Sequence, residues 1–265
     1  MDFERFYGAE NGGLRMADRS SILEIGVTMG GGVLITGTDT GVGKTFVACG
    51  LAASLGDYGY RVAVMKPAET GCADKDGELF AEDAARLKEA SGCLEPIEKI
   101  CPYRLPEPLA PSIAAERAGV TIDIDHLLAI YNEISAQHDI TLVEGAGGLM
   151  VPLLPSYTYA DFAKVLNLPL IVVAANRLGA INHLLLTLEH ASGKGLRVLG
   201  YVLNQIDSPL SLAAETNREV LANLSAAPCL AELPFLENME AKNLPPDWFK
   251  ERFAFSFIES ALNRR

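Results

Sequence analysis

The sequence lacks any run of lysine or arginine, and its 22 basic residues stand against 34 acidic ones, for a net charge of −12 at pH 7. Duplex DNA, RNA and anionic membrane surfaces each require clustered positive charge, so the composition argues against all three as the main partner. Cysteine is scarce as well, with five residues, an odd number, and no CxxC pair. A disulfide framework and a structural zinc site are therefore disfavoured, and free thiols in a reducing cytoplasm are expected.

Long hydrophobic runs are also missing. The longest apolar stretch, residues 165–175, contains Asn167 and Pro169 and is far too short to cross a membrane. Residues 1–29 carry no basic segment followed by an apolar core, so they do not read as a signal peptide. We expect residues 1–29 to be a poorly ordered extension and residues 30–265 to form one domain.

What the sequence does contain is a regular alternation of short apolar runs and helix-like segments. Runs that are apolar on both faces are typical of parallel strands covered by helices on each side. The runs span residues 33–36, 61–65, 140–143, 170–174, 198–203 and 229–230, and the helix-like segments span residues 44–55, 79–90, 123–137, 181–191 and 212–224. This alternation predicts an α/β fold with a single doubly wound, mostly parallel sheet and a site at the carboxyl ends of its strands.

Residues 101–112 interrupt this pattern with four prolines, at positions 102, 106, 108 and 111. Proline disfavours helix interiors, so the stretch is predicted to be a non-helical loop. Such a loop either lines a binding cleft or is a plain surface connection, and the sequence favours neither alternative.

The strongest chemical signal is Gly37-Thr-Asp-Thr-Gly-Val-Gly-Lys-Thr45, which follows the first strand and opens a helix. A glycine-rich turn at a helix N-terminus directs backbone N–H groups at an anion, as in the phosphate-binding loops of P-loop NTPases. Lys44 would reach the β and γ phosphates, and the Thr45 hydroxyl would bind Mg²⁺. The spacing differs from the common pattern, because five residues rather than four separate Gly37 from Gly43.

Charged residues follow two further strands. Glu144 ends an apolar strand just before glycines, where P-loop proteins place an acid of the Mg²⁺ shell. Lys66 follows residues 62–65, so its ammonium would point into the cleft and neutralise charge in a transition state. Asp83 is a weaker candidate, because acids are common in the first turn of a helix.

Together these pieces resemble one family. The phosphate loop, Lys66-Pro-Ala-Glu-Thr-Gly71, Glu144-Gly-Ala-Gly-Gly148, Gly179-Ala-Ile-Asn-His183 and Glu232-Leu-Pro234 follow the order and approximate spacing of the dethiobiotin synthetases. The resemblance implies a cytoplasmic, homodimeric ligase of biotin biosynthesis. Such an enzyme uses ATP and Mg²⁺ to make dethiobiotin from 7,8-diaminopelargonic acid and CO₂ or bicarbonate, by forming carbon–nitrogen bonds and closing a ring.

The resemblance also implies roles for individual residues. Lys66, Lys44 and Thr45 would be catalytic, and Thr45, Asp83 and Glu144 would hold Mg²⁺. The diamine would be bound by Lys66, Thr70, Gly148 and, from across the dimer, Asn182. The residues implied in ATP binding are Thr40, Gly41, Val42, Gly43, Lys44, Thr45, Phe46, Asp83, Glu144, Gly145, Ala146, Gly147, Asn204, Gln205, Pro234, Phe235, Leu236 and Glu240.

Two positions depart from the family pattern: Gly41 stands where some members have glutamate, and Thr216 where some have a tyrosine that binds the substrate carboxylate. A ParA/MinD-like ATPase switch is the alternative reading, but its signature lysine falls at the position of Asp39 here. A ligase related to cobyrinic or cobyric acid synthases would need a glutaminase domain, for which no residues remain.

Overall fold

A computed structural model describes residues 31–237 and 247–255 of the chain. The expected N-terminal extension, residues 1–29, and the candidate residue Glu240 lie outside the described residues. The described chain builds a six-stranded sheet in the order β12-β11-β10-β1-β7-β2, in which all neighbouring strands run parallel. Its strands are β1 Gly31–Gly37, β2 Val62–Met65, β7 Ile140–Gly148, β10 Leu170–Ala175, β11 Val198–Asn204 and β12 Cys229–Leu233. Each apolar run predicted to be a strand is confirmed, but β7 extends beyond the predicted residues 140–143, so Glu144 lies within the strand rather than at its end.

Strand β1 occupies the middle of the sheet, between β7 and β10. The chain passes from β1 to β2 at one edge, and after β7 it continues to β10 on the other side of β1. The order of strands therefore reverses beside β1, and ligands of doubly wound sheets bind at such a switch point. All residues of β1, β2 and β10 are buried, because helices cover both faces.

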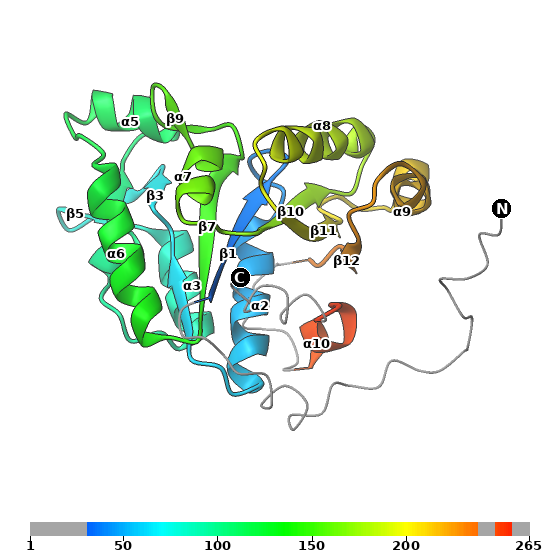
Figure 1. Cartoon of the computed structure of the whole chain (residues 1–265), viewed down its shortest axis with the longest axis horizontal. Helices are drawn as coiled ribbons and strands as arrows, with labels where there is room; N and C mark the ends of the chain where they lie inside the picture. The colour runs from blue at the N-terminus through cyan, green and yellow to red at the C-terminus, as the bar shows by residue number, and fades with distance from the viewer. Residues whose placement is uncertain (1–30, 238–246, 256–265) are drawn as a thin grey trace.

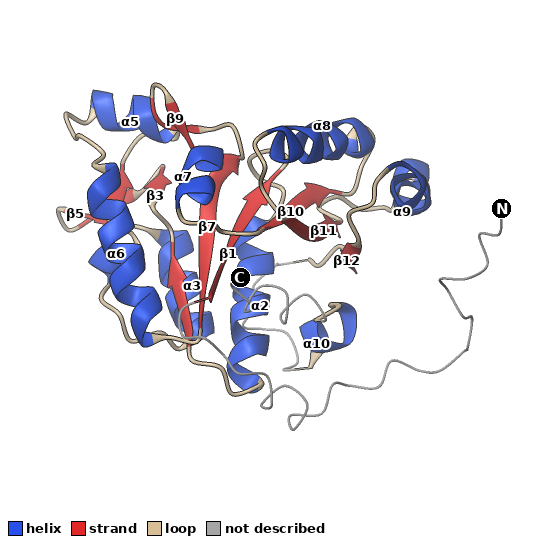
Figure 2. Ribbon diagram, viewed as in Figure 1, coloured by secondary structure: helices blue, strands red, loops and turns tan. Residues whose placement is uncertain are grey.

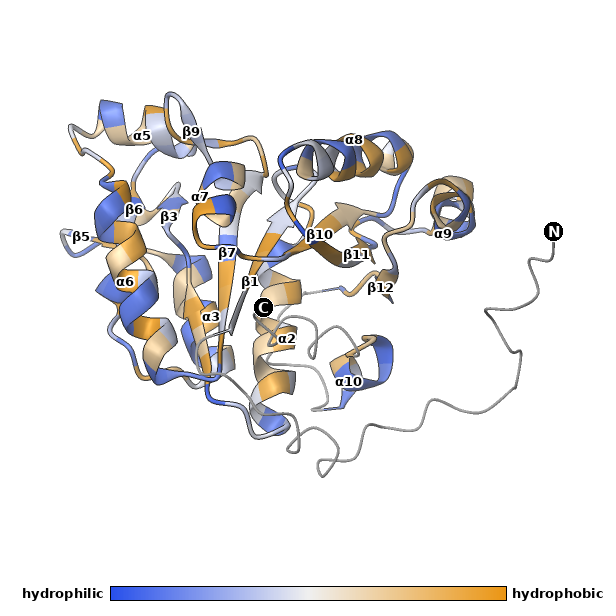
Figure 3. Ribbon diagram, viewed as in Figure 1, coloured by the Kyte–Doolittle hydropathy of each residue, from blue (hydrophilic) through white to orange (hydrophobic). Residues whose placement is uncertain are grey.

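The helices form layers on the two sides of the sheet (Figures 1 and 2). In the view of Figure 1, α8 and α9 lie above β10 to β12, whereas α2 and α10 lie below them. Figure 3 shows the apolar colour along β7 and β10, in the interior between these layers. The helices are α2 Lys44–Asp57, α3 Glu82–Ser91, α4 Ile97–Ile100, α5 Pro111–Arg117, α6 Ile124–Gln137, α7 Tyr159–Val165, α8 Ala180–Gly193, α9 Leu212–Leu224 and α10 Trp248–Arg252. Within the described ranges, no helix is both long and apolar enough to cross a membrane.

One predicted helix begins later than expected. The helix expected from residue 79 begins at Glu82, because residues 73–80 form a hairpin of β4 (Ala73–Lys75) and β5 (Glu78–Phe80). The hairpin turns at Asp76 and Gly77, with φ angles of 58° and 88°, and the Asp74 carboxylate accepts the Gly77 N–H at 2.8 Å. Local turn chemistry therefore outweighs the helical pattern at this point.

The proline-rich stretch of residues 101–112 is not wholly irregular. It contains β6 (Tyr103–Leu105), which pairs in parallel with β3 (Ala68–Thr70) directly after β2. Its last proline, Pro111, begins α5, a position that tolerates proline because the first N–H groups of a helix have no intrahelical partner. A further small hairpin joins β8 (Pro152–Leu154) to β9 (Tyr157–Thr158) after β7.

Candidate active site

The phosphate-binding loop connects the end of β1 to the start of α2. Gly41 and Gly43 have φ angles of 76° and 91°, a left-handed conformation that favours glycine. A side chain on Gly37 would meet the Asp39 carbonyl at 2.7 Å, so the tight turn also needs glycine there. The loop therefore presents the N-terminus of α2 to an anion, as the sequence predicts.

Lys44, the first residue of α2, is buried and lies back over the loop. Its ammonium donates a hydrogen bond to the Asp39 carbonyl at 3.0 Å. Burial lowers the pKa of Lys44 from its ordinary value, and the carboxylates of Glu144 and Asp83 only partly oppose this effect. A polyanionic phosphate would stabilise the charged ammonium further, so an anion binds favourably beside Lys44.

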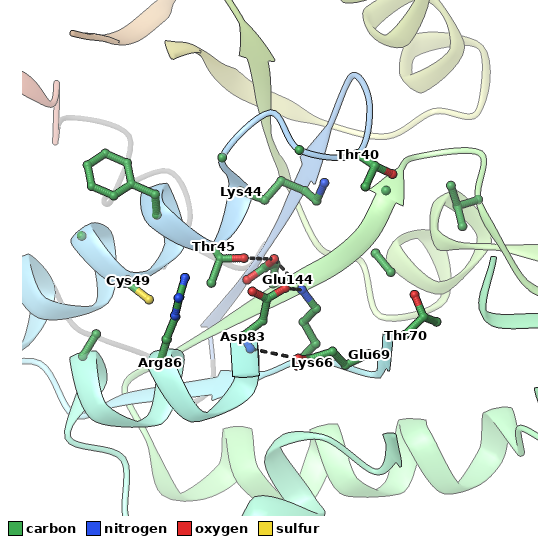
Figure 4. Close-up of a pocket in the computed structure, with 18 of the residues that line it drawn as sticks. Thr40, Lys44, Thr45, Cys49, Lys66, Glu69, Thr70, Asp83, Arg86 and Glu144 are labelled. Carbon is green, nitrogen blue, oxygen red and sulfur yellow. Dashed lines mark hydrogen bonds and ion pairs between the residues drawn. The ribbon is translucent and has the colours of Figure 1, made fainter. Parts of the chain in front are cut away.

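Lys66, Asp83, Glu144 and Thr45 form one contiguous cluster (Figure 4). Lys66, 3% exposed at the end of β2, donates to Asp83 Oδ2 at 2.5 Å and to Glu144 Oε1 at 2.7 Å. The Thr45 hydroxyl donates to the same Glu144 oxygen at 2.8 Å. Burial by itself lowers the pKa of Lys66, but the two carboxylates outweigh it and raise the pKa above its ordinary value. The lysine is therefore a fixed cation at neutral pH.

The oxygen atoms of this cluster fit a magnesium ion. Glu144 is 1% exposed, and its second carboxylate oxygen, Oε2, is buried without a hydrogen-bond partner among the described residues. Burial without a partner is costly for a carboxylate oxygen, and a hard cation would satisfy it. No group of three or more His, Cys, Asp or Glu side chains is arranged for a metal in the described ranges. An ion here would therefore use Thr45, Asp83, Glu144 and the phosphates of a nucleotide, as Mg²⁺ commonly does.

Glu69 is a site residue that the sequence analysis missed. It lies on β3, is 6% exposed, and accepts the backbone N–H groups of Asp83 and Ala84 at 2.9 and 3.0 Å. The residue at the N-cap of α3, Ala81, has no side-chain acceptor to offer. A helix start without a local cap was the one signal in the sequence that could have pointed to a distant acceptor.

A cavity of about 1140 Å³ lies against the phosphate loop and extends between α2 and α3. Pro108 to Pro111 border it, so the proline-rich stretch does line a cleft. The predicted site residues that line this cavity are Thr40, Gly41, Gly43, Lys44, Thr45, Phe46, Lys66, Thr70, Asp83, Glu144, Ala146 and Gly147.

Other predicted residues lie outside the lining of this cavity. Asn204, fully buried at the end of β11, donates from Nδ2 to the Val42 carbonyl at 2.9 Å and so braces the phosphate loop. Its Oδ1 has no hydrogen-bond partner in the described part of the chain, which fits a polar ligand such as a base. The rest of this group, whose roles stay predictions, are Val42, Gly145, Gly148, Asn182, Gln205, Pro234, Phe235 and Leu236.

The parallel sheet, the phosphate loop and the acid–lysine cluster define a P-loop nucleotide-binding protein. In agreement, the family model described as an AAA domain matches residues 31–243. Among solved structures, the septum site-determining protein MinD of Pyrococcus horikoshii, complexed with Mg-ADP, has a TM-score of 0.51 at 17% identity, over 87% of this chain and 94% of that one. The MinC:MinD complex of Aquifex aeolicus has a TM-score of 0.52 at 16% identity, over 81% and 86%. These likenesses concern the fold alone.

Curated relatives specify the family. The ATP-dependent dethiobiotin synthetase BioD of Bacillus cereus (strain G9842) is 41% identical over 231 residues, 87% of this chain and 94% of that protein. Its counterpart in Anaeromyxobacter sp. (strain K) is 43% identical over 209 residues, 76% and 92%. The chain belongs to the family of ATP-dependent dethiobiotin synthetases. The resemblance drawn from the sequence motifs is thereby confirmed, as is the class, an ATP-dependent ligase.

Proposed function

We propose that this protein makes dethiobiotin from 7,8-diaminopelargonic acid and CO₂, using ATP and Mg²⁺ and releasing ADP and phosphate. The observation that carries the proposal is the cluster of Lys66, Asp83 and Glu144 beside the phosphate loop, in which Lys66 and Glu144 are buried. A fixed cation and metal-binding oxygens next to bound phosphates support phosphoryl transfer. The curated relatives named dethiobiotin synthetase support the identity of the substrate.

The first steps join the substrate to CO₂ and activate it. One amine nitrogen of the diamine bonds to CO₂, which gives a carbamate anion and releases a proton. A carbamate oxygen then attacks the γ-phosphorus of ATP, and the bond between that phosphorus and the oxygen bridging to the β-phosphate breaks. Both reactants are anions, so their repulsion opposes the approach. The ammonium groups of Lys44 and Lys66 would lower that repulsion and stabilise the charge on the transferred group.

The last step closes the ring. The neighbouring amine attacks the carbonyl carbon of the carbamic-phosphoric anhydride and loses a proton, and the carbon–oxygen bond to the phosphoryl group breaks. Inorganic phosphate leaves, and a five-membered urea forms. Mg²⁺ held by Thr45, Asp83 and Glu144 would neutralise phosphate charge throughout. Within the chain, Lys66 keeps its proton because two carboxylates hold its ammonium. It therefore acts by electrostatics and positioning rather than as a base.

The diamine itself would be held by several segments. Thr70 ends β3 beside the cavity, and Asn182 lies in the first turn of α8, whose N-terminus would receive the substrate carboxylate from across a homodimer. The Thr216 hydroxyl donates to the Leu212 and Ala213 carbonyls of its own helix, at 3.1 and 3.3 Å. That arrangement supports a carboxylate site that does not use Thr216. The free thiols support residence in the reducing cytoplasm.

The proposal is tested by measuring phosphate and dethiobiotin together. The purified protein is incubated with ATP, Mg²⁺ and bicarbonate, with and without 7,8-diaminopelargonic acid. We expect phosphate release to depend on the diamine and to equal the dethiobiotin formed. Hydrolysis of ATP at the same rate without the diamine would contradict the proposal and favour a switch ATPase.

A further inference from the structure

Glu69 connects a strand of the cleft to the helix that carries Asp83. Its Oε1 accepts the N–H of Asp83 at 2.9 Å, and its Oε2 accepts the N–H of Ala84 at 3.0 Å. The two acceptors therefore lie at the first turn of α3, although Glu69 is more than ten residues away along the chain. Figure 4 shows Glu69 beside Lys66 and below Asp83. A carboxylate in this position also interacts favourably with the N-terminal end of the helix dipole.

The position of Glu69 is itself well fixed. Its strand, β3, pairs with β6, with Glu69 opposite Arg104 in the register. The chain turns immediately after β3 at Gly71, whose φ is 78° and whose N–H donates to the Glu107 carbonyl at 3.2 Å. Glu69 is 6% exposed, so water competes little for its oxygens. The proline-rich stretch thus supports β3, and β3 supports the start of α3.

The Asp83 side chain depends on this support because the N-cap residue of its helix makes no side-chain cap. Ala81 precedes α3 and provides no side-chain acceptor. Asp83 is the second residue of α3, and its carboxylate contacts Lys66 at 2.5 Å. A shift or fraying of the first turn would move this carboxylate away from Lys66 and Glu144. Ligand position matters because partners behind a metal ligand commonly set metal affinity by about 10- to 100-fold.

We propose that Glu69 is a positioning residue for the metal-nucleotide site: by holding the backbone of residues 83 and 84, it keeps the Asp83 carboxylate where it binds the ion. The inference rests on the proposed function only in that Asp83 is taken as a metal ligand. Glu69 itself does not bind the ion, because both its oxygens face backbone N–H groups. Its effect on the reaction is therefore transmitted through Asp83.

The experiment separates positioning from simple stabilisation of a helix. The variants are Glu69→Ala, which removes both acceptors, and Glu69→Gln, which keeps one oxygen. The matched control is Asp123→Ala, because Asp123 caps α6 by accepting the N–H of His126 at 3.2 Å and does not line the cavity. Binding of Mn²⁺, as a probe for Mg²⁺, is titrated by electron paramagnetic resonance in the presence of a non-hydrolysable ATP analogue. The melting temperature of each variant is measured in parallel.

We expect Glu69→Ala to weaken Mn²⁺ binding by about tenfold or more, with a smaller effect in Glu69→Gln. Asp123→Ala should lower the melting temperature without changing Mn²⁺ binding by more than about twofold, since its cap lies away from the cavity. If Glu69→Ala lowers the melting temperature but leaves Mn²⁺ binding like that of the control, the positioning role is wrong. Should Glu69→Ala fail to fold, Glu69→Gln with unchanged Mn²⁺ binding would overturn it equally.

Failure of this inference is distinguishable from failure of the proposed function. The titration requires no diamine and no turnover, so it reports the metal-nucleotide site alone. Absence of Mn²⁺ binding in the unmodified protein would refute the metal site itself. Normal Mn²⁺ binding in every variant would refute only the role of Glu69, and dethiobiotin formation would remain to be judged by its own assay.

Discussion

Replacing Lys66 by methionine removes the cation between Asp83 and Glu144, at 2.5 and 2.7 Å from their oxygens. Breaking a buried ion pair by removing one partner costs about 3 to 5 kcal/mol, because a charge is left uncompensated. The Asp83 side chain is 35% exposed and water screens it, whereas that of Glu144 is 1% exposed. We therefore expect the lower limit, a loss of about 3 kcal/mol in the free energy of unfolding. Turnover should fall by about 100- to 1,000-fold, as for other preorganised transition-state contacts.

The stability of the Lys66→Met variant is measured by urea unfolding without ligands, and its kcat by dethiobiotin formation. Lys99→Met is a matched control, because Lys99 also bridges two carboxylates, those of Glu133 at 2.6 Å and Glu95 at 3.3 Å, but lies at the surface. Water screens that cluster, so Lys99→Met should lower the free energy of unfolding much less than Lys66→Met and leave kcat unchanged. The reasoning is refuted if Lys66→Met unfolds like Lys99→Met, or if its kcat stays within threefold of the unmodified protein.

Three further predictions concern the metal, the pH and the packing. Glu144→Gln should raise the Mg²⁺ concentration for half-maximal activity by about tenfold or more, and an unchanged titration would discard the ligand role. Burial alone raises the pKa of Asp161, but hydrogen bonds from Thr158 and the ammonium of Lys194 lower it to about 2. Because the folded-state pKa is depressed, Asp161→Asn should lower the free energy of unfolding by about 1 kcal/mol at neutral pH. That difference should vanish as the pH falls from about 4 to 2 in acid unfolding curves, and a constant difference would contradict the assignment. Gly50→Ala should lower the melting temperature, because a β-carbon there overlaps the Phe249 ring, whereas Gly56→Ala in the same helix meets open space and should not.

The parts of the fold that the sequence predicts are those set by local pattern. A strand buried on both faces is apolar throughout, so the six central strands could be located before their order was known. The phosphate loop is equally local, because the turn between Gly37 and Lys44 requires glycine where φ is positive. Lys66 and Glu144 could be predicted to meet because they come from neighbouring parallel strands. Lys66 directly follows β2, and Glu144 is the residue of β7 just beyond Val143, the partner of the last β2 residue.

The parts that escaped prediction depend on contacts between distant segments. Glu69 has an unremarkable place in the sequence, and its role appears only when β3 pairs with β6 and faces the start of α3. The β4–β5 hairpin was missed because its second strand contains Leu79 and Phe80, whose apolar spacing with the residues that follow also suits a helix. Asn204 is implied in ATP binding by the family resemblance, but its hydrogen bond to the Val42 carbonyl has no counterpart in any local pattern.

In the proposed reaction the γ-phosphoryl group is transferred to a carbamate of the substrate rather than to water. The most direct test supplies ¹⁸O-labelled bicarbonate with the diamine, ATP and Mg²⁺, and analyses the released phosphate by mass spectrometry before the label exchanges with solvent. In the proposed reaction a carbamate oxygen bonds to phosphorus and leaves carbon when the ring closes. The released phosphate should therefore carry one ¹⁸O derived from bicarbonate. Phosphate without label, formed in step with dethiobiotin, would contradict it.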